Sequence, residues 1–122
     1  MTVAVLGASD NPERYSYQAV KLLQKNGHTV YPVNPKLKSI DGQKVYASLA
    51  DLPGPVDTLS VYVSKDISSK IGDEILKSKP RRILFNPGAE NPELDAKVTQ
   101  KGIKALEACT LVLLRTNQFD RS

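Results

Sequence analysis

Residues 2–12 read TVAVLGASDNP, a short apolar run with β-branched residues that stops at a glycine and gives way to a polar loop. Continuous apolar character, without alternation, is typical of a strand buried on both faces of a parallel sheet. Gly7 lies where the chain must turn sharply after that strand, and a glycine lets a ligand approach the backbone closely. A helical pattern follows the loop. The stretch therefore predicts a strand, a tight turn and a helix.

The first helix is predicted over residues 16–26, where apolar residues recur at three- and four-residue spacing. Ser16 is suited to cap its amino end, where free N–H groups favour an anion. Gly27 is expected to end the helix in the left-handed conformation. A second strand follows at residues 29–33. Its Pro32 lacks a backbone donor, which favours either the end of the paired region or an outer position in the sheet.

The rest of the chain continues to alternate between strand-like and helix-like segments. Strands are expected over residues 58–63, 82–85 and 103–106, helices over 47–52, 67–77 and 92–100, and either a strand or a packed tail over 111–114. This alternation predicts one α/β domain over residues 1–122. Its architecture is a Rossmann-like open parallel sheet of about five strands, with helices on both faces.

Composition excludes several classes of protein. A chain of 122 residues buries roughly two-thirds of its unfolded surface without disulfides, and Cys109 is its only cysteine. No apolar run approaches the ~20 residues of a membrane span, and no basic leader precedes the first strand. We therefore expect a cytoplasmic protein that does not insert into a membrane. A net charge of +4 suits an anionic small ligand as readily as nucleic acid.

In open α/β sheets, ligands bind outside the carboxyl ends of the strands. Four loops should therefore lie side by side: Gly7-Ala8-Ser9, Asn34-Pro35-Lys36, Tyr62-Val63-Ser64 and Asn86-Pro87-Gly88.

The first of these loops offers donors for a phosphate. It is not a G-x-G-x-x-G fingerprint, because Gly7 is the only glycine before Gly27. Ser9, Ser16 and the backbone amides nevertheless supply uncharged donors. Of Tyr15 and Tyr17, which flank the helix start, one could stack on a ligand, and the alternatives are packing against the protein or simple surface exposure. The alternative is a tight strand-to-helix turn without a ligand.

The second loop narrows the class of nucleotide. Folds that bind NAD place Asp or Glu after the second strand to hold the ribose hydroxyl. This chain instead has Asn34, Pro35 and Lys36 there, with Lys38 close by. Positive charge in place of a carboxylate suits a ribose that carries an extra phosphate, as in NADP or the 3′-phospho-ADP end of coenzyme A. Alternatively, the two lysines form a solvated loop face.

The sequence lacks the usual catalytic sets. His28 is the sole histidine, so a histidine metal cluster or a Ser-His-Asp triad cannot form, and a contact with the helix C-terminus is expected for it. Cys109 is expected to be a buried, inert thiol. Lys79, Arg81 and Arg82 are interpreted as a solvated cluster at the amino end of a strand. Nucleic-acid binding is disfavoured, because no basic helix stripe or set of stacking aromatics is present.

A series of short motifs carries a family resemblance: Gly7-Ala8-Ser9, Arg14-Tyr15-Ser16, Gly27-His28, Pro32-Val33-Asn34-Pro35 and Pro55-Val56-Asp57. Through about residue 106 the chain resembles the small CoA-binding domain proteins, stand-alone relatives of the CoA-binding domain of succinyl-CoA ligase α subunits. The resemblance implies a Rossmann-like fold and a ligand that is coenzyme A or an acyl-CoA.

Carried over by position, the resemblance assigns residues to parts of the ligand. Phosphates are expected at Gly7, Ala8, Ser9 and Ser16, the adenosine end at Asn34, Pro35 and Lys36, and the next wall at Tyr62 and Val63. The fourth loop of the family commonly reads Gln-x-Gly, so Asn86 and Gly88 stand at its corresponding positions and depart from it at the first.

Nothing in this chain matches the catalytic half of the ligases, which carries their phosphorylated histidine. The sequence therefore predicts a CoA-binding protein without catalytic machinery of its own, and it indicates no particular protein partner. Two alternatives remain at this point. One is a small reductase-like enzyme that uses NADP, and the other is a regulatory subunit that kept the fold and lost the ligand.

Overall fold

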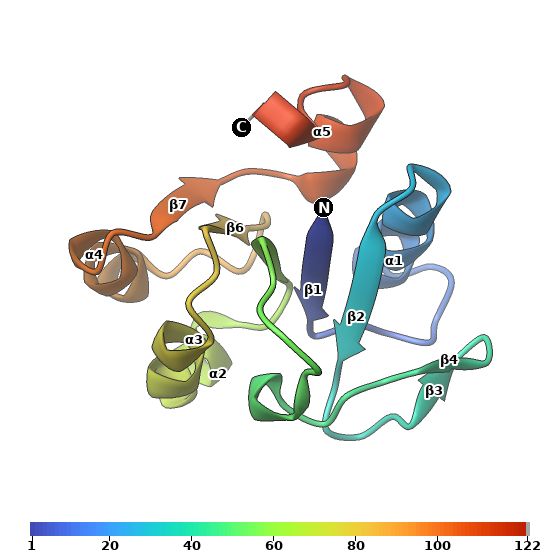
Figure 1. Ribbon diagram of the computed structural model, residues 1–122, viewed down its shortest axis with the longest axis horizontal. Coiled ribbons are helices and arrows are strands. Elements are labelled where there is room, and N and C mark those ends of the chain that lie inside the picture. The colour runs from blue at the N-terminus through green and yellow to red at the C-terminus, as the bar shows by residue number, and fades with distance from the viewer. Residues whose placement is uncertain (122) are drawn as a thin grey trace.

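A five-stranded parallel sheet forms the centre of the protein, and its strands run in the order β2-β1-β5-β6-β7 (Figure 1). The computed structural model describes residues 1–121. The strands of this sheet are β1 (Thr2–Leu6), β2 (Thr29–Val33), β5 (Thr58–Val61), β6 (Arg82–Phe85) and β7 (Lys104–Glu107). The helices are α1 (Tyr15–Lys25), α2 (Lys65–Lys70), α3 (Gly72–Ser78), α4 (Pro92–Gln100) and α5 (Thr110–Arg115). Smaller elements are a ribbon of β3 (Ser39–Ile40) and β4 (Gln43–Lys44), and the 3₁₀ turns η1 (Leu49–Asp51) and η2 (Phe119–Arg121).

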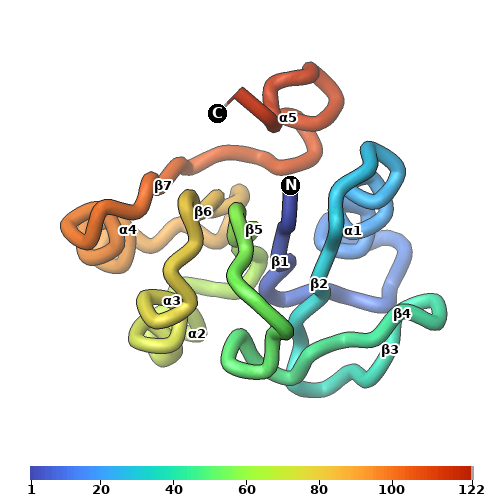
Figure 2. The backbone as a smooth tube through the Cα atoms, in the orientation of Figure 1, coloured from blue at the N-terminus to red at the C-terminus, as the bar shows by residue number. Residues whose placement is uncertain are grey.

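The predicted fold class is confirmed, because helices cover both faces of the sheet (Figure 2). Along β1, Val3 and Val5 pack with residues of α1 and α5, whereas Ala4 and Leu6 pack with residues of α3 and α4. A strand that buries both faces needs apolar residues at every position, which explains the unbroken run in the sequence. The outer position predicted for Pro32 is also confirmed, since β2 lies at the edge of the sheet.

The helix expected over residues 67–77 is in fact two helices, α2 and α3, that meet at Ile71 and Gly72. The backbone of Ile71 leaves the helical region (φ −109°, ψ 19°). A Cβ on Gly72 would lie 3.4 Å from the Cδ1 atom of Leu94 in α4. Glycine is a weak helix former, and here it also admits the neighbouring helix.

The segment 111–114, expected as a strand or a packed tail, belongs to helix α5. Its residue Leu114 joins Val20 and Leu23 of α1 in one apolar cluster. A short apolar run carries no usable periodicity, so the sequence could not separate a strand from a helix there. The strand expected to reach Val63 ends at Val61, which leaves Tyr62 and Val63 in the loop that follows.

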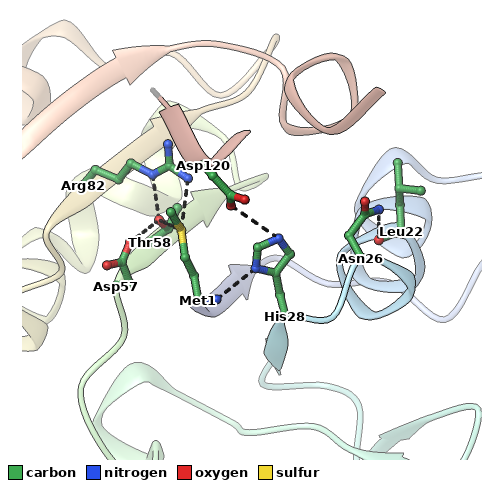
Figure 3. A network of polar contacts seen from close by, with 8 residues as sticks. All are labelled: Met1, Leu22, Asn26, His28, Asp57, Thr58, Arg82 and Asp120. Carbon is green, nitrogen blue, oxygen red and sulfur yellow. Dashed lines mark hydrogen bonds and ion pairs between the residues drawn. The ribbon is translucent and has the colours of Figure 1, made fainter. Parts of the chain in front are cut away.

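Arg82 corrects one interpretation of the sequence, because it is buried and is not part of a solvated cluster. Its Nε donates to the Thr58 hydroxyl at 2.7 Å (Figure 3). Its guanidinium lies 4.4 Å from the centre of the Phe119 ring. Nearby, the His28 Nδ1 atom lies 3.1 Å from the amino group of Met1, and its Nε2 atom lies 3.8 Å from Asp120 (Figure 3). The backbone N–H of His28 meets the end of α1, but its ring joins the two ends of the chain.

No helix within residues 1–121 is long and apolar enough to cross a membrane.

Candidate functional site

The loop after β1 turns at Gly7, whose φ is +89°. A Cβ at this position would lie 2.8 Å from the Val63 side chain and 3.2 Å from backbone atoms of Tyr62 and Val63. Glycine is thus required both by the left-handed backbone and by the close approach of the loop after β5. The N–H groups of Gly7 and Ala8 both donate to the carbonyl of Val33, at 2.9 and 3.2 Å. These two amides are already used within the protein, so they do not form the anion cradle expected from the sequence.

The amino end of α1 retains free donors instead. Its N-cap position is Arg14, and no side chain within residues 1–121 caps the helix there. Ser16, expected as the cap, is buried inside the first turn. The first helical bond runs from the N–H of Gln18 to the carbonyl of Arg14, so the N–H groups of residues 15–17 precede the helical ladder. No carboxylate lies in this first turn, which leaves the positive end of the helix dipole uncompensated.

A polar hollow of about 430 Å³ opens in front of these donors. It is lined by Gly7, Ala8, Ser9, Glu13, Arg14, Tyr15, Ser16, Asn34 and Tyr62. We call it the polar compartment. The Ser9 hydroxyl oxygen accepts from the N–H of Asn11 at 3.0 Å, which leaves its own O–H free to donate. Tyr15 is 70% exposed, so its ring stands at the rim rather than in the core.

An apolar hollow of about 390 Å³ lies on the other side of Gly7 and Asn34, which line both spaces. It is lined by Leu6, Gly7, Val33, Asn34, Pro35, Lys36, Ala47, Ser48, Leu49, Val63, Ile67, Ile71 and Glu74. We call it the apolar compartment. Lys36 is exposed at its edge, whereas Lys38 lies outside it, on the approach to β3. The two lysines expected beside the extra phosphate therefore differ in position.

Asn34 connects the two compartments. Its side-chain N–H donates to the carbonyl of Ala8 at 2.8 Å, and its side-chain oxygen accepts from the N–H of Lys36 at 2.8 Å. The first bond fixes the loop after β1, and the second shapes the turn that carries Lys36. Asn34 is therefore a positioning residue for both loops.

The ribbon of β3 and β4 holds the far side of the second loop against α1. The Tyr17 hydroxyl donates to Asp41 at 2.5 Å, and the Lys21 ammonium lies 2.8 Å from the same carboxylate. These two partners lower the pKa of Asp41, and the bond to Asp41 raises the pKa of Tyr17. These surface contacts add to buried ones, because Ile40 of β3 packs in the apolar cluster with Val20 and Leu23 of α1.

Tyr62 stands between the polar compartment and the interior. Its hydroxyl is buried, and no group within residues 1–121 meets it in hydrogen-bonding geometry. Burial raises the pKa of this phenol, an effect that the nearby hydroxyls of Thr110 and Ser60 partly oppose. Tyr62 therefore stays neutral, and it lines the polar compartment while it packs against the core.

Asn86 and Gly88 line neither compartment. Asn86 is fully buried, and its N–H₂ group donates to Ser60 Oγ at 3.0 Å and to the Val61 carbonyl at 2.9 Å. Its oxygen accepts from the N–H of Thr110 at 2.8 Å, which anchors the start of α5. The contact expected between Asn86 and a ligand does not fit this arrangement, because its amide is used inside the protein. Gly88 is exposed, and its N–H donates to Glu90 at 3.0 Å.

The other predicted site residues do converge: those of the first loop and helix start line the polar compartment, and Pro35, Lys36 and Val63 line the apolar one. Sequence reasoning missed the opposite wall, formed by residues 47–49 with Ile67 and Ile71. In the sequence, the two isoleucines belong to the apolar face of the helix expected over residues 67–77. That pattern predicts core, and periodicity cannot tell a core face from a ligand face.

The described residues contain no group of three or more His, Cys, Asp or Glu side chains that could hold a metal ion. His28 lies at the opposite edge of the sheet, beside Met1. What the site can do chemically is bind: it offers N–H and hydroxyl donors in one compartment and aliphatic contact in the other.

Comparison with known proteins shows the family of the chain. The family model described as "CoA binding domain" matches residues 1–115. The uncharacterized protein YneT of Bacillus subtilis is 30% identical over 100 residues, which cover 82% of this chain and 74% of YneT. The ADP-forming acetate–CoA ligase of Methanocaldococcus jannaschii is 32% identical over 103 residues, which cover 81% of this chain and only 15% of the ligase.

A solved structure from Thermus thermophilus, cell-free ID.343, superposes with a TM-score of 0.89 at 30% identity. The match covers 97% of this chain and 90% of that one.

Proposed function

The chain belongs to the CoA-binding domain family, and on that premise we propose that it binds coenzyme A across the two compartments that meet at Gly7 and Asn34. The observation that carries the proposal is the contrast between them: one has polar donors and the other has aliphatic walls. A CoA molecule has the same division, with a charged diphosphate beside an adenine ring.

The diphosphate is assigned to the polar compartment. The uncapped N–H groups of residues 15–17 point their dipoles toward it, and Ser9 adds a hydroxyl donor. Arg14 supplies a full positive charge at the rim. Glu13 is the one carboxylate in the lining, and it stands exposed at the edge.

The adenine ring is assigned to the apolar compartment, between Val63 and Ile67 on one side and Pro35 on the other. Glu74, the only acidic residue in the described lining, is already engaged: its Oε1 accepts from the backbone N–H groups of Leu49 and Ala50, at 2.7 and 3.2 Å. Lys36 at the edge then meets the 3′-phosphate of the ribose. This contact separates CoA from dephospho-CoA.

Isothermal titration calorimetry with CoA, acetyl-CoA, dephospho-CoA and NADP tests the proposal. We expect CoA to bind several-fold more tightly than dephospho-CoA, and acetyl-CoA to match CoA, because the thiol end has no assigned contact in either compartment. Tighter binding of NADP than of CoA would favour the reductase alternative. Failure of all four ligands to bind would favour a regulatory subunit and overturn the proposal.

We further propose that the chain binds CoA without catalysing a reaction on it. No described residue of the two compartments is a histidine or cysteine, and burial raises the pKa of Tyr62, so its phenol stays protonated at neutral pH and does not accept a proton. Incubation of the protein with acetyl-CoA and water, followed by a free-thiol assay, tests this. Release of thiol above the protein-free rate, abolished by a substitution in the compartments, would contradict it.

A further inference from the structure

We propose that the cleft at the amino-terminal edge of the sheet is a docking surface for a protein partner that presents carboxylates beside aliphatic side chains. The inference does not depend on CoA binding, because the lysines of this cleft, Lys77, Lys79 and Lys101, line neither CoA compartment, although its first hollow borders the apolar compartment at Leu49 and Glu74. The residues that precede β5, β6 and β7 form this edge: Val56, Arg81 and Ile103.

The cleft consists of two adjoining hollows. One, of about 430 Å³, lies between α3 and the segment 49–56. The other, of about 550 Å³, lies between the end of α3 and the turn 101–103. Lys77 and Lys79 line both hollows and therefore stand where the two meet. A partner segment that reaches into both hollows would pass these two lysines.

The charge of the cleft is strongly positive. Lys77, Lys79 and Lys101 are exposed, and no carboxylate within residues 1–121 forms an ion pair with them. Arg81 does have a partner, since it lies 2.8 Å from Asp57. Glu74, the one carboxylate in the lining, faces backbone N–H groups of η1. The three exposed ammonium groups therefore favour a partner that carries carboxylates.

The apolar part of the lining favours a polypeptide over nucleic acid. Leu52 and Val56 line the first hollow, and Leu76 and Ile103 line the second. Among residues 1–121, no aromatic side chain lines either hollow, so the base stacking that holds single strands has no platform here. Aliphatic walls between separate cations match a segment in which Glu or Asp alternates with Leu or Val.

A second copy of this chain is a poorer match. Its acidic segment 90–95 contains Asn91 and Leu94, and both are buried in its own structure. That segment cannot offer its aliphatic side chain without unfolding the start of α4. The proposal therefore commits to a different protein.

Fluorescence anisotropy with a labelled 12-residue peptide of alternating Glu and Leu tests the proposal, with a Gln-for-Glu peptide as the control probe. The double variant Lys77→Glu/Lys101→Glu reverses two charges in the cleft. The variant Lys25→Glu/Arg115→Glu makes the same charge change at exposed positions on the opposite helical layer. We expect salt-sensitive binding of the acidic peptide that falls about tenfold in the cleft variant and less than twofold in the control variant.

Equal weakening in both variants would show attraction by net charge alone and would overturn the proposal. Tighter binding of a single-stranded oligonucleotide than of the peptide would do the same. So would self-association, measured by analytical ultracentrifugation, that only the cleft variant abolishes. Calorimetry of the cleft variant with CoA separates this inference from the proposed function, because CoA affinity is expected to be unchanged.

Discussion

The side-chain amide of Asn34 donates a hydrogen bond to the carbonyl of Ala8 at 2.8 Å, and so joins the loops that follow two neighbouring strands. The backbone N–H of Asn34 also donates to the backbone carbonyl of Tyr46, at 2.9 Å. A single residue thus holds the first loop, the turn carrying Lys36 and the segment leading to η1. Asn34, in the Val33-Asn34-Pro35 element of the sequence, therefore holds in place the loops that line the polar and apolar compartments.

Replacement of Asn34 by Ala is expected to loosen both compartments. The variant loses two local bonds of its side chain, so the free energy of unfolding should fall by ~1–2 kcal/mol and CoA affinity by roughly tenfold. Urea unfolding and calorimetry measure the two effects. Asn26→Ala is the matched control, because Asn26 also donates to a backbone carbonyl, that of Leu22, but lies far from the crevice. Normal CoA affinity in Asn34→Ala would contradict the role assigned to Asn34.

Gly7→Ala tests the close approach of the loops after β1 and β5. The new Cβ meets the Val63 side chain and two backbone atoms, in a backbone conformation that Ala disfavours. We expect a loss of stability of about 3 kcal/mol, as the sum of the left-handed conformation and overpacking.

Gly42→Ala is the control for Gly7→Ala. Gly42 also has a positive φ, of +82°, but a Cβ there meets no atom within 4 Å. It should lose only ~1 kcal/mol, from the backbone conformation alone. Thermal unfolding measures both variants. Equal losses of stability in the two variants would show that Val63 and Tyr62 can move away from the new Cβ at no cost in free energy.

Lys36→Gln should weaken CoA binding selectively. The expected loss is roughly fivefold for CoA and less than twofold for dephospho-CoA, which lacks the 3′-phosphate, because an exposed ion pair contributes about 1 kcal/mol. Lys38→Gln removes the same charge two residues away, outside the compartment, and should leave both affinities unchanged. Calorimetry at low salt measures all four values. An equal loss for both ligands in Lys36→Gln would place the phosphate elsewhere.

Stability should depend on pH through His28. Burial is the main cause that lowers its pKa from the ordinary value of 6.5, and the positive charge of the Met1 amino group adds to it. The unfolded chain then binds a proton at a higher pH than the folded protein does. The contribution of His28 to the free energy of unfolding is therefore complete above about pH 6.5, and it is lost as the pH falls toward the pKa of His28 in the folded protein.

Urea unfolding between pH 8 and pH 5 measures this dependence in the wild type and in His28→Gln. The variant should show a flatter profile in that window, whereas the titration of carboxylates below it should be shared by both proteins. Stability of the wild type that rises as the pH falls from 6.5 would show that Asp120, which raises the pKa, outweighs burial.

Asn86→Ala separates a structural role from a binding role. The substitution removes three buried hydrogen bonds and leaves the N–H of Thr110 without its acceptor, so we expect a loss of ~2–4 kcal/mol in the free energy of unfolding. CoA affinity, measured well below the melting temperature, should change less than threefold. A large loss of affinity with little loss of stability would return Asn86 to the ligand.

The sequence carried most of the fold. The unbroken apolar run at residues 2–6 predicts a strand that is buried on both faces. Pro32 predicts an outer strand, because proline has no backbone N–H to donate to a neighbouring strand. It did not reveal the break between α2 and α3, since a weak helix former such as Gly72 can also lie within one continuous helix. The burial of Arg82 likewise depends on Thr58 and Phe119, which lie far away along the chain.

For the candidate site, the sequence by itself determined which residue types stand at the carboxyl ends of the first three strands, because the alternation of strands and helices brings those ends to one edge. Only the tertiary structure decided which of their polar groups remain available. The backbone N–H groups of Gly7 and Ala8 donate to the carbonyl of Val33. The side-chain amide of Asn86 is hydrogen-bonded to Ser60, Val61 and Thr110. A donor is satisfied by whichever acceptor the order of the strands brings beside it, and a linear sequence does not contain that order.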